Sequence, residues 1–228
     1  MIKLYGFGEK FGLVDASPFV VKVDLFLRVS ALTYEPIADF KSLKKSPKEK
    51  LPFIEDDGIK IGDSSFILKY LSKKHDIQLD TKLSDEQKAT AYLYTKALDD
   101  SLYWCLMYSR WVSADTWPLL RLAFFSDLPR VLKFIVPSLV KKNVIKSLHL
   151  QGLGRHSHNE LLGLTDTLMH SLSDVLAEND YFFGDTISNF DIVAYAHLCQ
   201  FISVNFDNEF NLLAKKYNNL VNFCQRIE

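Results

Sequence analysis

Ser17-Pro18 is the first of three short segments whose residue types could do chemistry. Serine is a preferred residue at a helix start, and proline suits the first helical position. A hydroxyl there can donate to a thiolate, while the positive end of the helix lowers the pKa of a nearby thiol. Because no histidine is close in sequence, we interpret Ser17 as a group that stabilises the sulfur of a ligand rather than as a nucleophile. A purely structural helix cap is the alternative.

Leu51-Pro52 is the second segment, because it begins what we expect to be an inner strand of a sheet, where proline is normally excluded. A cis proline at the entrance to the strand would resolve this and leave the backbone N–H and C=O of Leu51 unpaired. These two groups could bind an extended peptide by strand addition. The alternative is a trans proline in an exposed turn, which is the commoner isomer.

Asp63-Ser64 is the third segment, at a point where a strand is expected to lead into a helix. The free N–H groups and positive end of a helix favour an anion such as a ligand carboxylate. An adjacent acidic side chain can hold an ammonium group of the same ligand. The pair therefore suits the head of an α-amino acid, and a plain helix cap is again the alternative.

Hydrophobic periodicity indicates the elements that must position these segments. Apolar residues predict a strand from Ile2, a helix over 18–31, a strand over 33–37, a hairpin over 51–61 with its turn at Asp57-Gly58, and a helix from Asp63 to His75. After residue 80 only helical patterns remain. We expect these helices at 84–112, 116–126, 128–147, 157–178, 189–204 and 208–226.

The order of these elements predicts an α+β domain over 1–78, a linker over 79–86 and an all-helical domain over 87–228. The formal net charge is -1, so no overall field attracts nucleic acid. The three cysteines are too few for a disulfide framework. His156 and His158 are two residues apart and do not converge on a helix, so no metal site is expected. The start of the chain lacks a signal peptide, and a cytoplasmic protein is expected.

Seven Lys or Arg residues and one acid, Asp127, lie between Trp117 and His158, interleaved with apolar residues. A solvated helix face over a core is the commoner meaning of such a pattern. Contact with an anionic membrane surface is the alternative. Pro137 is expected to interrupt the helix in this segment.

Taken together, the three segments resemble the glutathione transferase superfamily, which has a thioredoxin-like first domain and an all-α second domain. Phe183-Gly184 through Ser188 and Asp191 is similar to the superfamily's folding motif, in which Ser188 and Asp191 would form a capping box. The chain most resembles the metaxin-like, failed axon connections branch. The residues that carry this likeness are Lys45 to Lys48, Leu102-Tyr103-Trp104 with Tyr108, Arg110 and Trp111, and Gln151 to His156.

The resemblance implies a glutathione site. Ser17 would face the thiol, the Leu51 backbone before Pro52 would pair with the cysteinyl unit, and Asp63 with Ser64 would hold the γ-glutamyl end. Lys50 or Lys41 would meet the glycyl carboxylate.

Trp104, Tyr108 and Trp111 share one helix face, which in this fold could form a wall for an apolar co-substrate. An aromatic core or a dimer seam is the other meaning of that face. The implied function is conjugation of glutathione to a small electrophile in a homodimer without a metal ion. A non-catalytic adaptor for protein or membrane-surface contacts is the alternative.

Overall fold

The computed structural model describes residues 1–39 and 42–228 in full, together with the backbone of the two residues between them. A four-stranded sheet forms the first part of the chain, in the order β2-β1-β3-β4. Its strands are β1 (Ile2–Gly6), β2 (Tyr34–Ala38), β3 (Phe53–Asp56) and β4 (Ile59–Gly62). β1 runs parallel to β2, and β3 is antiparallel to both β1 and β4. Asp57 and Gly58 both have positive φ and form the turn of the predicted hairpin.

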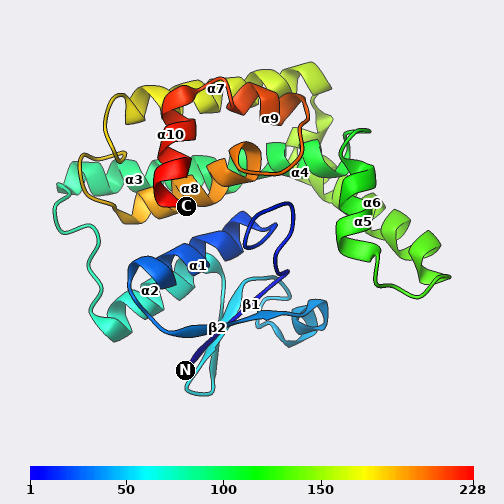
Figure 1. Ribbon diagram of the computed structural model, residues 1–228, viewed down its shortest axis with the longest axis horizontal. Coiled ribbons are helices and arrows are strands. Elements are labelled where there is room, and N and C mark those ends of the chain that lie inside the picture. Colours follow the sequence, from blue (N-terminus) through cyan, green and yellow to red (C-terminus); the bar gives the residue numbers. More distant parts are fainter.

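Two helices connect and cover this sheet. α1 (Pro18–Val29) links β1 to β2, and α2 (Ser64–His75) follows β4. A short 3-10 helix, η1 (Phe40–Lys45), lies between β2 and β3. Figure 1 shows α1 lying between the sheet and the helices of the second half of the chain. Its Val23 and Phe26 side chains are fully buried there, because α1 packs on the sheet side and also against α8.

The remainder of the chain is helical, as predicted. The elements are α3 (Asp85–Ala97), the π-helix η2 (Leu98–Leu102), α4 (Tyr103–Trp111), α5 (Trp117–Phe125), α6 (Leu132–Gln151), the 3-10 helix η3 (Leu153–Arg155), α7 (His158–Leu176), α8 (Asn189–Ile202), α9 (Glu209–Ala214) and α10 (Asn218–Ile227). The single helix expected over 84–112 is therefore continuous except for the π-helical turn at its centre. α8 is the central helix of this half, because 13 of its 14 residues are buried.

Two of the predicted helices are wrong in detail. The helix expected over 208–226 is two helices, which separate at Lys215–Tyr217. Tertiary contacts explain the break, because Tyr217 donates to the Asp166 carboxylate at 2.7 Å and Asn219 donates to the carbonyl of Ser173 at 2.9 Å. Pro137 does not interrupt α6, which continues through it from Leu132 to Gln151.

The start of α8 shows how the two halves are joined. The Asp191 carboxylate accepts the backbone N–H of Ser188 and of Phe182, each at 2.8 Å, and the Ser188 hydroxyl at 2.6 Å, so the expected pairing of Ser188 with Asp191 is confirmed. Asp80, between α2 and α3, accepts the backbone and side-chain N–H groups of Asn189. Within the described residues, no helix is long and apolar enough to cross a membrane. The domain limits at 78 and 87 stay predictions.

Candidate functional site

The register of the sheet brings the three chemical segments to one end of the sheet. Tyr5, near the carboxyl end of β1, pairs with Phe53 at the start of β3, and Phe53 pairs with Gly62 at the end of β4. The loop that leads from β1 to Ser17, the Leu51-Pro52 entrance to β3, and the β4–α2 junction at Asp63 therefore lie at the same end of the sheet. The sequence predicted the segments, and strand pairing places them together.

Ser17 precedes the first residue of α1, with an extended backbone at φ −98° and ψ 122°. Its side chain does not cap the helix, which corrects the expectation of a structural cap. The residue is 9% exposed, and its hydroxyl makes no hydrogen bond with the described residues. The Oγ atom is therefore available to a ligand at the positive end of α1.

Asp15 holds the loop that presents Ser17, and the sequence reasoning missed it. Its buried carboxylate accepts the backbone N–H groups of Phe7 at 2.7 Å and of Gly8 and Ser17 at 2.8 Å. Burial raises the pKa of Asp15 to about 6, and these three donors oppose the rise. Gly6 makes room for the carboxylate, because a Cβ at this position would lie 2.5 Å from Asp15 Oδ2.

The Leu51–Pro52 peptide bond is cis, as predicted, and both residues are buried. Pairing of β3 begins only at Phe53. The N–H and C=O of Leu51 consequently have no hydrogen-bond partner among the described residues. Directly before Leu51, Lys50 has an exposed side chain, and its carbonyl accepts the Ser46 hydroxyl at 2.6 Å. The side chain of Lys41, the other lysine considered for the glycyl carboxylate, lies outside the described part of the structure.

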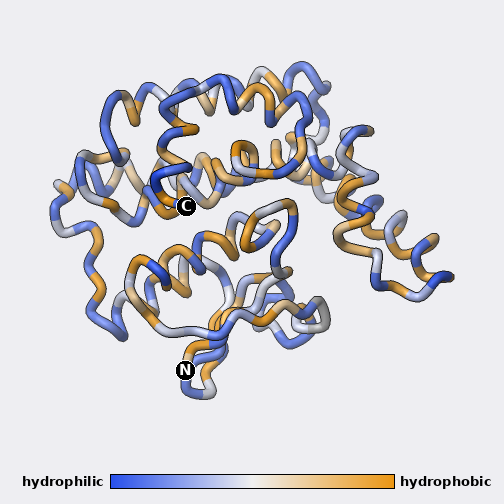
Figure 2. Tube along the Cα trace, viewed as in Figure 1, coloured by the Kyte–Doolittle hydropathy of each residue, from blue (hydrophilic) through white to orange (hydrophobic). Residues whose placement is uncertain are grey.

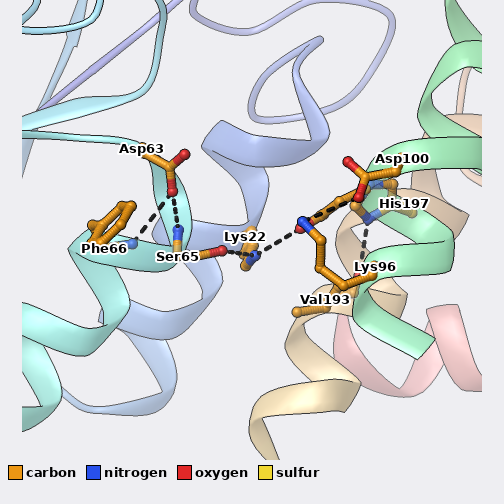
Figure 3. Close-up of polar contacts among 9 residues, drawn as sticks. Lys22, Asp63, Ser65, Phe66, Lys96, Asp100, Val193 and His197 are labelled. Atoms are coloured by element: carbon orange, nitrogen blue, oxygen red, sulfur yellow. Dashed lines mark hydrogen bonds and ion pairs between the residues drawn. The ribbon is translucent and has the colours of Figure 1, made fainter. Parts of the chain in front are cut away.

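Asp63 begins α2 in a left-handed backbone conformation, at φ 82°. One carboxylate oxygen accepts the N–H of Ser65 at 3.0 Å and of Phe66 at 3.4 Å, so Asp63 is a helix cap. Its second oxygen points away from the helix (Figure 3) and Asp63 is exposed, which leaves that oxygen open to an ammonium group. Ser64 is buried beside it at the first position of the helix.

A buried lysine lies beneath the start of α2. Lys22 on α1 is 2% exposed, and its ammonium donates to the Ser65 hydroxyl at 3.2 Å and lies 3.6 Å from Asp99 on η2 (Figure 3). Burial lowers the pKa of Lys22, whereas the Asp99 carboxylate raises it. This pair could not be predicted from the sequence, because Lys22 has the usual spacing of a helix residue and Asp99 lies 77 positions away.

His197 on α8 completes this cluster. Its Nδ1 lies 3.0 Å from the carbonyl of Val193, and its Nε2 lies 3.5 Å from Asp99 Oδ1 without a hydrogen bond. Burial lowers the pKa of His197 to about 4, so the ring is neutral at pH 7. Lys22, Asp99 and His197 thus join α1, η2 and α8 at the interface between the two halves of the chain.

Arg110 on α4 joins the halves at a second point. This buried side chain donates to the carbonyl of Ala16 at 2.7 Å and to the side-chain oxygen of Gln200 at 2.7 Å. Burial lowers its pKa to about 10, so it stays charged at pH 7. Gln200 also donates to the carbonyl of Asp15 at 3.2 Å. The helical half therefore holds the two residues that precede Ser17.

The predicted aromatic face of α4 packs within the helical half. Tyr108 contacts the rings of His158 and Phe210, and Trp111 contacts Trp117. Trp104 is half-buried beside Tyr103, whose ring contacts Phe19 of α1. A co-substrate wall formed by Trp104, Tyr108 and Trp111 stays a prediction. Tyr103 and Arg110, which are adjacent in sequence to Trp104 and Trp111, do contact the first half, at Phe19 and Ala16 respectively.

Other groups that could act chemically are buried or dispersed. The three cysteines are free and buried, and burial raises the pKa of Cys199 to about 12. No group of three or more metal-ligating side chains occurs among the described residues. A cavity of about 270 Å³ lies between α1 and α8, lined in part by Val21, Arg28 and Glu228, and it includes none of the predicted site residues.

Comparisons with known proteins match both halves. Residues 18–116 match the glutathione S-transferase N-terminal domain, and residues 165–227 match the glutathione S-transferase C-terminal domain. The most similar solved structures include a beta-etherase from Sphingobium sp. strain SYK-6, with a TM-score of 0.67 and 18% identity. That alignment covers 99% of this chain and 94% of the other, and it shows that the two share a fold.

Two curated relatives are 30% identical. Failed axon connections of Drosophila melanogaster aligns over 243 residues, which are 100% of this chain and 57% of that protein, so the chain spans little more than half of this relative. Isoprene-epoxide–glutathione S-transferase of Rhodococcus sp. (strain AD45) aligns over 204 residues, 87% of this chain and 85% of that enzyme. The predicted superfamily, fold and branch are confirmed, and the chain belongs to the glutathione S-transferase family.

Proposed function

We propose that this end of the sheet binds glutathione and activates its thiol for conjugation to a small apolar electrophile. The observation that carries this proposal is the convergence of three groups with unused hydrogen-bonding capacity: the Ser17 hydroxyl, the Leu51 backbone and the outer Asp63 oxygen. Two findings support it: a relative that is 30% identical is named as a glutathione S-transferase, and both halves of the chain match glutathione S-transferase domains.

Each group has one role in this proposal. The Leu51 N–H and C=O pair with the cysteinyl unit as an added strand would. The outer oxygen of Asp63 holds the γ-glutamyl ammonium, and Ser64 at the start of α2 holds the γ-glutamyl carboxylate. Lys50 provides a cation for the glycyl carboxylate. Together these contacts place the sulfur beside Ser17.

Activation of the thiol follows from the position of Ser17. Its hydroxyl donates to the sulfur and the end of α1 favours negative charge, so the glutathione thiol loses its proton to solvent more readily. The thiolate then forms a sulfur–carbon bond with the electrophile as the bond from that carbon to its leaving group breaks. Trp104 and Trp111 are the candidate residues for the co-substrate side. Detoxification in the cytoplasm by a homodimer is the setting that we propose for this reaction.

The test is Ser17→Ala, assayed with glutathione and a model electrophile. A hydrogen bond to a charged group contributes about 1.5–3 kcal/mol, so turnover should fall about tenfold to a hundredfold while glutathione binding persists. The matched control is Ser30→Ala at the other end of α1, whose hydroxyl is also unpaired. Equal turnover in wild type and Ser17→Ala would remove Ser17 from the mechanism.

A non-catalytic adaptor is the second candidate. It is favoured by the aromatic packing of α4, where Tyr108 contacts Phe210 and His158 of the helical half. Calorimetric titration with glutathione distinguishes the two candidates. Micromolar binding supports the enzyme, and absent binding supports the adaptor.

A further inference from the structure

Large apolar side chains are exposed on α5, on α6 and in the loop between them. Nine of the 17 exposed large apolar side chains among the described residues lie between positions 119 and 150. We name this region the hairpin surface. Its apolar members are Leu119, Leu122, Val131, Leu132, Phe134, Ile135, Leu139, Ile145 and Leu150. The sequence pattern was expected to mean a solvated face over a core, but here the apolar residues themselves face solvent.

The spacing on α6 and its preceding residue gathers these side chains on one side. Val131, Ile135 and Leu139 are four residues apart and 70%, 52% and 56% exposed. Lys142 and Lys146 continue the same stripe toward the end of the helix. The opposite side holds the buried residues Pro137 and Leu148.

The hairpin is anchored by its inner side. The Phe124 ring of α5 contacts Phe7 and Phe11 in the loop that leads to Ser17. Arg121 donates to the carbonyl of Lys133 at 3.1 Å, and the Lys141 ammonium lies 4.5 Å from the centre of the Trp117 ring. These contacts pack α5 against α6. Figure 1 shows that α5 and the first half of α6 stand out from one end of the molecule, and Figure 2 shows apolar residues along them.

Charge separates this region from the rest of the chain. Between Trp117 and His158 there are seven Lys or Arg residues and only Asp127 as an acid, whereas the whole chain has a net charge of -1. The remainder of the chain is therefore negative overall. Arg130, Lys142 and Lys146 are exposed among the apolar side chains. Exposed apolar side chains next to cations are the two features that bind a protein to the surface of an anionic membrane.

We propose that the hairpin surface docks peripherally on a membrane that contains anionic lipid. Phe134 and Ile135 would enter the boundary between headgroups and acyl chains, and the lysines would meet anionic headgroups. A second copy of the chain fits this surface less well, because a symmetric interface would bring two strongly basic regions together. This proposal does not rest on glutathione binding, since the exposed side of the hairpin faces away from the Ser17 loop.

Vesicle sedimentation tests the proposal. The full chain is mixed at low salt with vesicles of phosphatidylcholine containing about 30% phosphatidylserine, and with vesicles of phosphatidylcholine alone. We expect the protein to pellet with the anionic vesicles, to bind the neutral vesicles at least about tenfold more weakly, and to dissociate in about 0.5 M salt. Failure to pellet with anionic vesicles at low salt would overturn the proposal.

Two double variants assign the binding to this surface. Phe134→Ser with Ile135→Ser removes apolar contacts, and Lys142→Glu with Lys146→Glu reverses two charges. Each should weaken vesicle binding about tenfold or more. The matched controls alter exposed residues elsewhere: Leu93→Ser with Leu212→Ser, and Lys73→Glu with Lys216→Glu.

Equal binding by all four variants would refute the assignment. A self-association surface is detected by sedimentation velocity without vesicles. A fall in molecular mass in Phe134→Ser with Ile135→Ser, with no vesicle binding by wild type, would identify the hairpin surface as an interface between copies and overturn the membrane proposal.

Discussion

Replacement of Asp15 by asparagine tests how burial and hydrogen bonding together set the pKa of the Asp15 carboxylate. Burial disfavours the ionised form, and three backbone N–H groups favour it. The balance raises the folded-state pKa to about 6 from the ordinary value of 3.8. A carboxyl group with a raised folded pKa stabilises the fold fully below its unfolded pKa, and this stabilisation is lost as pH rises through about 6. Asparagine has the same shape and does not titrate.

The magnitude follows from the shift of the pKa. When the pH falls from about 7.5 to about 4.5, linkage increases the stability of the wild type relative to Asp15→Asn by about 2 kcal/mol. At pH 7.5 the variant should already be less stable by about 1–3 kcal/mol, because its amide NH2 faces one of the three N–H donors. Urea unfolding of both proteins at the two pH values measures the difference.

The control for this experiment is Asp115→Asn, since Asp115 is exposed. Its free energy of unfolding should differ from wild type by only a few tenths of a kcal/mol at either pH, about the usual size of a surface effect. A stability difference between wild type and Asp15→Asn that shrinks toward acid pH would refute the reasoning. That result would mean that the three N–H donors outweigh burial and lower the pKa of Asp15.

Two further substitutions test the contacts between the halves. Lys22→Met leaves the Asp99 carboxylate, which is 10% exposed, without its cation and should lower the free energy of unfolding by about 3 kcal/mol or more. The double variant Lys22→Met with Asp99→Asn should recover most of this loss. A loss below about 1 kcal/mol in the single variant would contradict the prediction. Arg110→Met removes the donors to Ala16 and Gln200 and should lower the free energy of unfolding in urea by about 2–3 kcal/mol. Turnover of glutathione should fall as well, because the Ser17 loop loses its support. Unchanged stability would show that Arg110 does not hold the Ser17 loop.

Features specified within a few residues could be predicted from the sequence. Asp57-Gly58 supplies the two positive φ values that the hairpin turn needs, and Ser188 with Asp191 supplies both partners of a helix start. The cis isomer of Leu51–Pro52 could be predicted because proline stands where an inner strand has to begin. These local signals, in their order along the chain, determine the fold class.

Features that depend on distant partners had no such signal. Lys22 is buried and the Asp99 side chain is 10% exposed because α1 meets η2, and neither residue is unusual for its helix. Arg110 likewise gave no sign of its partners, which are a backbone carbonyl 94 positions away and the side chain of Gln200. The exposure of Phe134 and Ile135 likewise follows from the way α6 leaves the body of the molecule. Periodicity identifies an apolar face but does not identify what covers it.

The Ser17 loop depends on both halves of the chain, and this bears on how the site must work. Asp15 fixes the loop from inside the first half through three backbone N–H groups, while Arg110 and Gln200 hold the carbonyls of Ala16 and Asp15 from the second half. A thioredoxin-like domain alone would leave those carbonyls without their donors and the buried Lys22 without the Asp99 carboxylate. The position of the Ser17 hydroxyl is therefore a property of the whole chain. Any movement of α4 or α8 relative to α1 would be transmitted to the atom that we propose faces the sulfur.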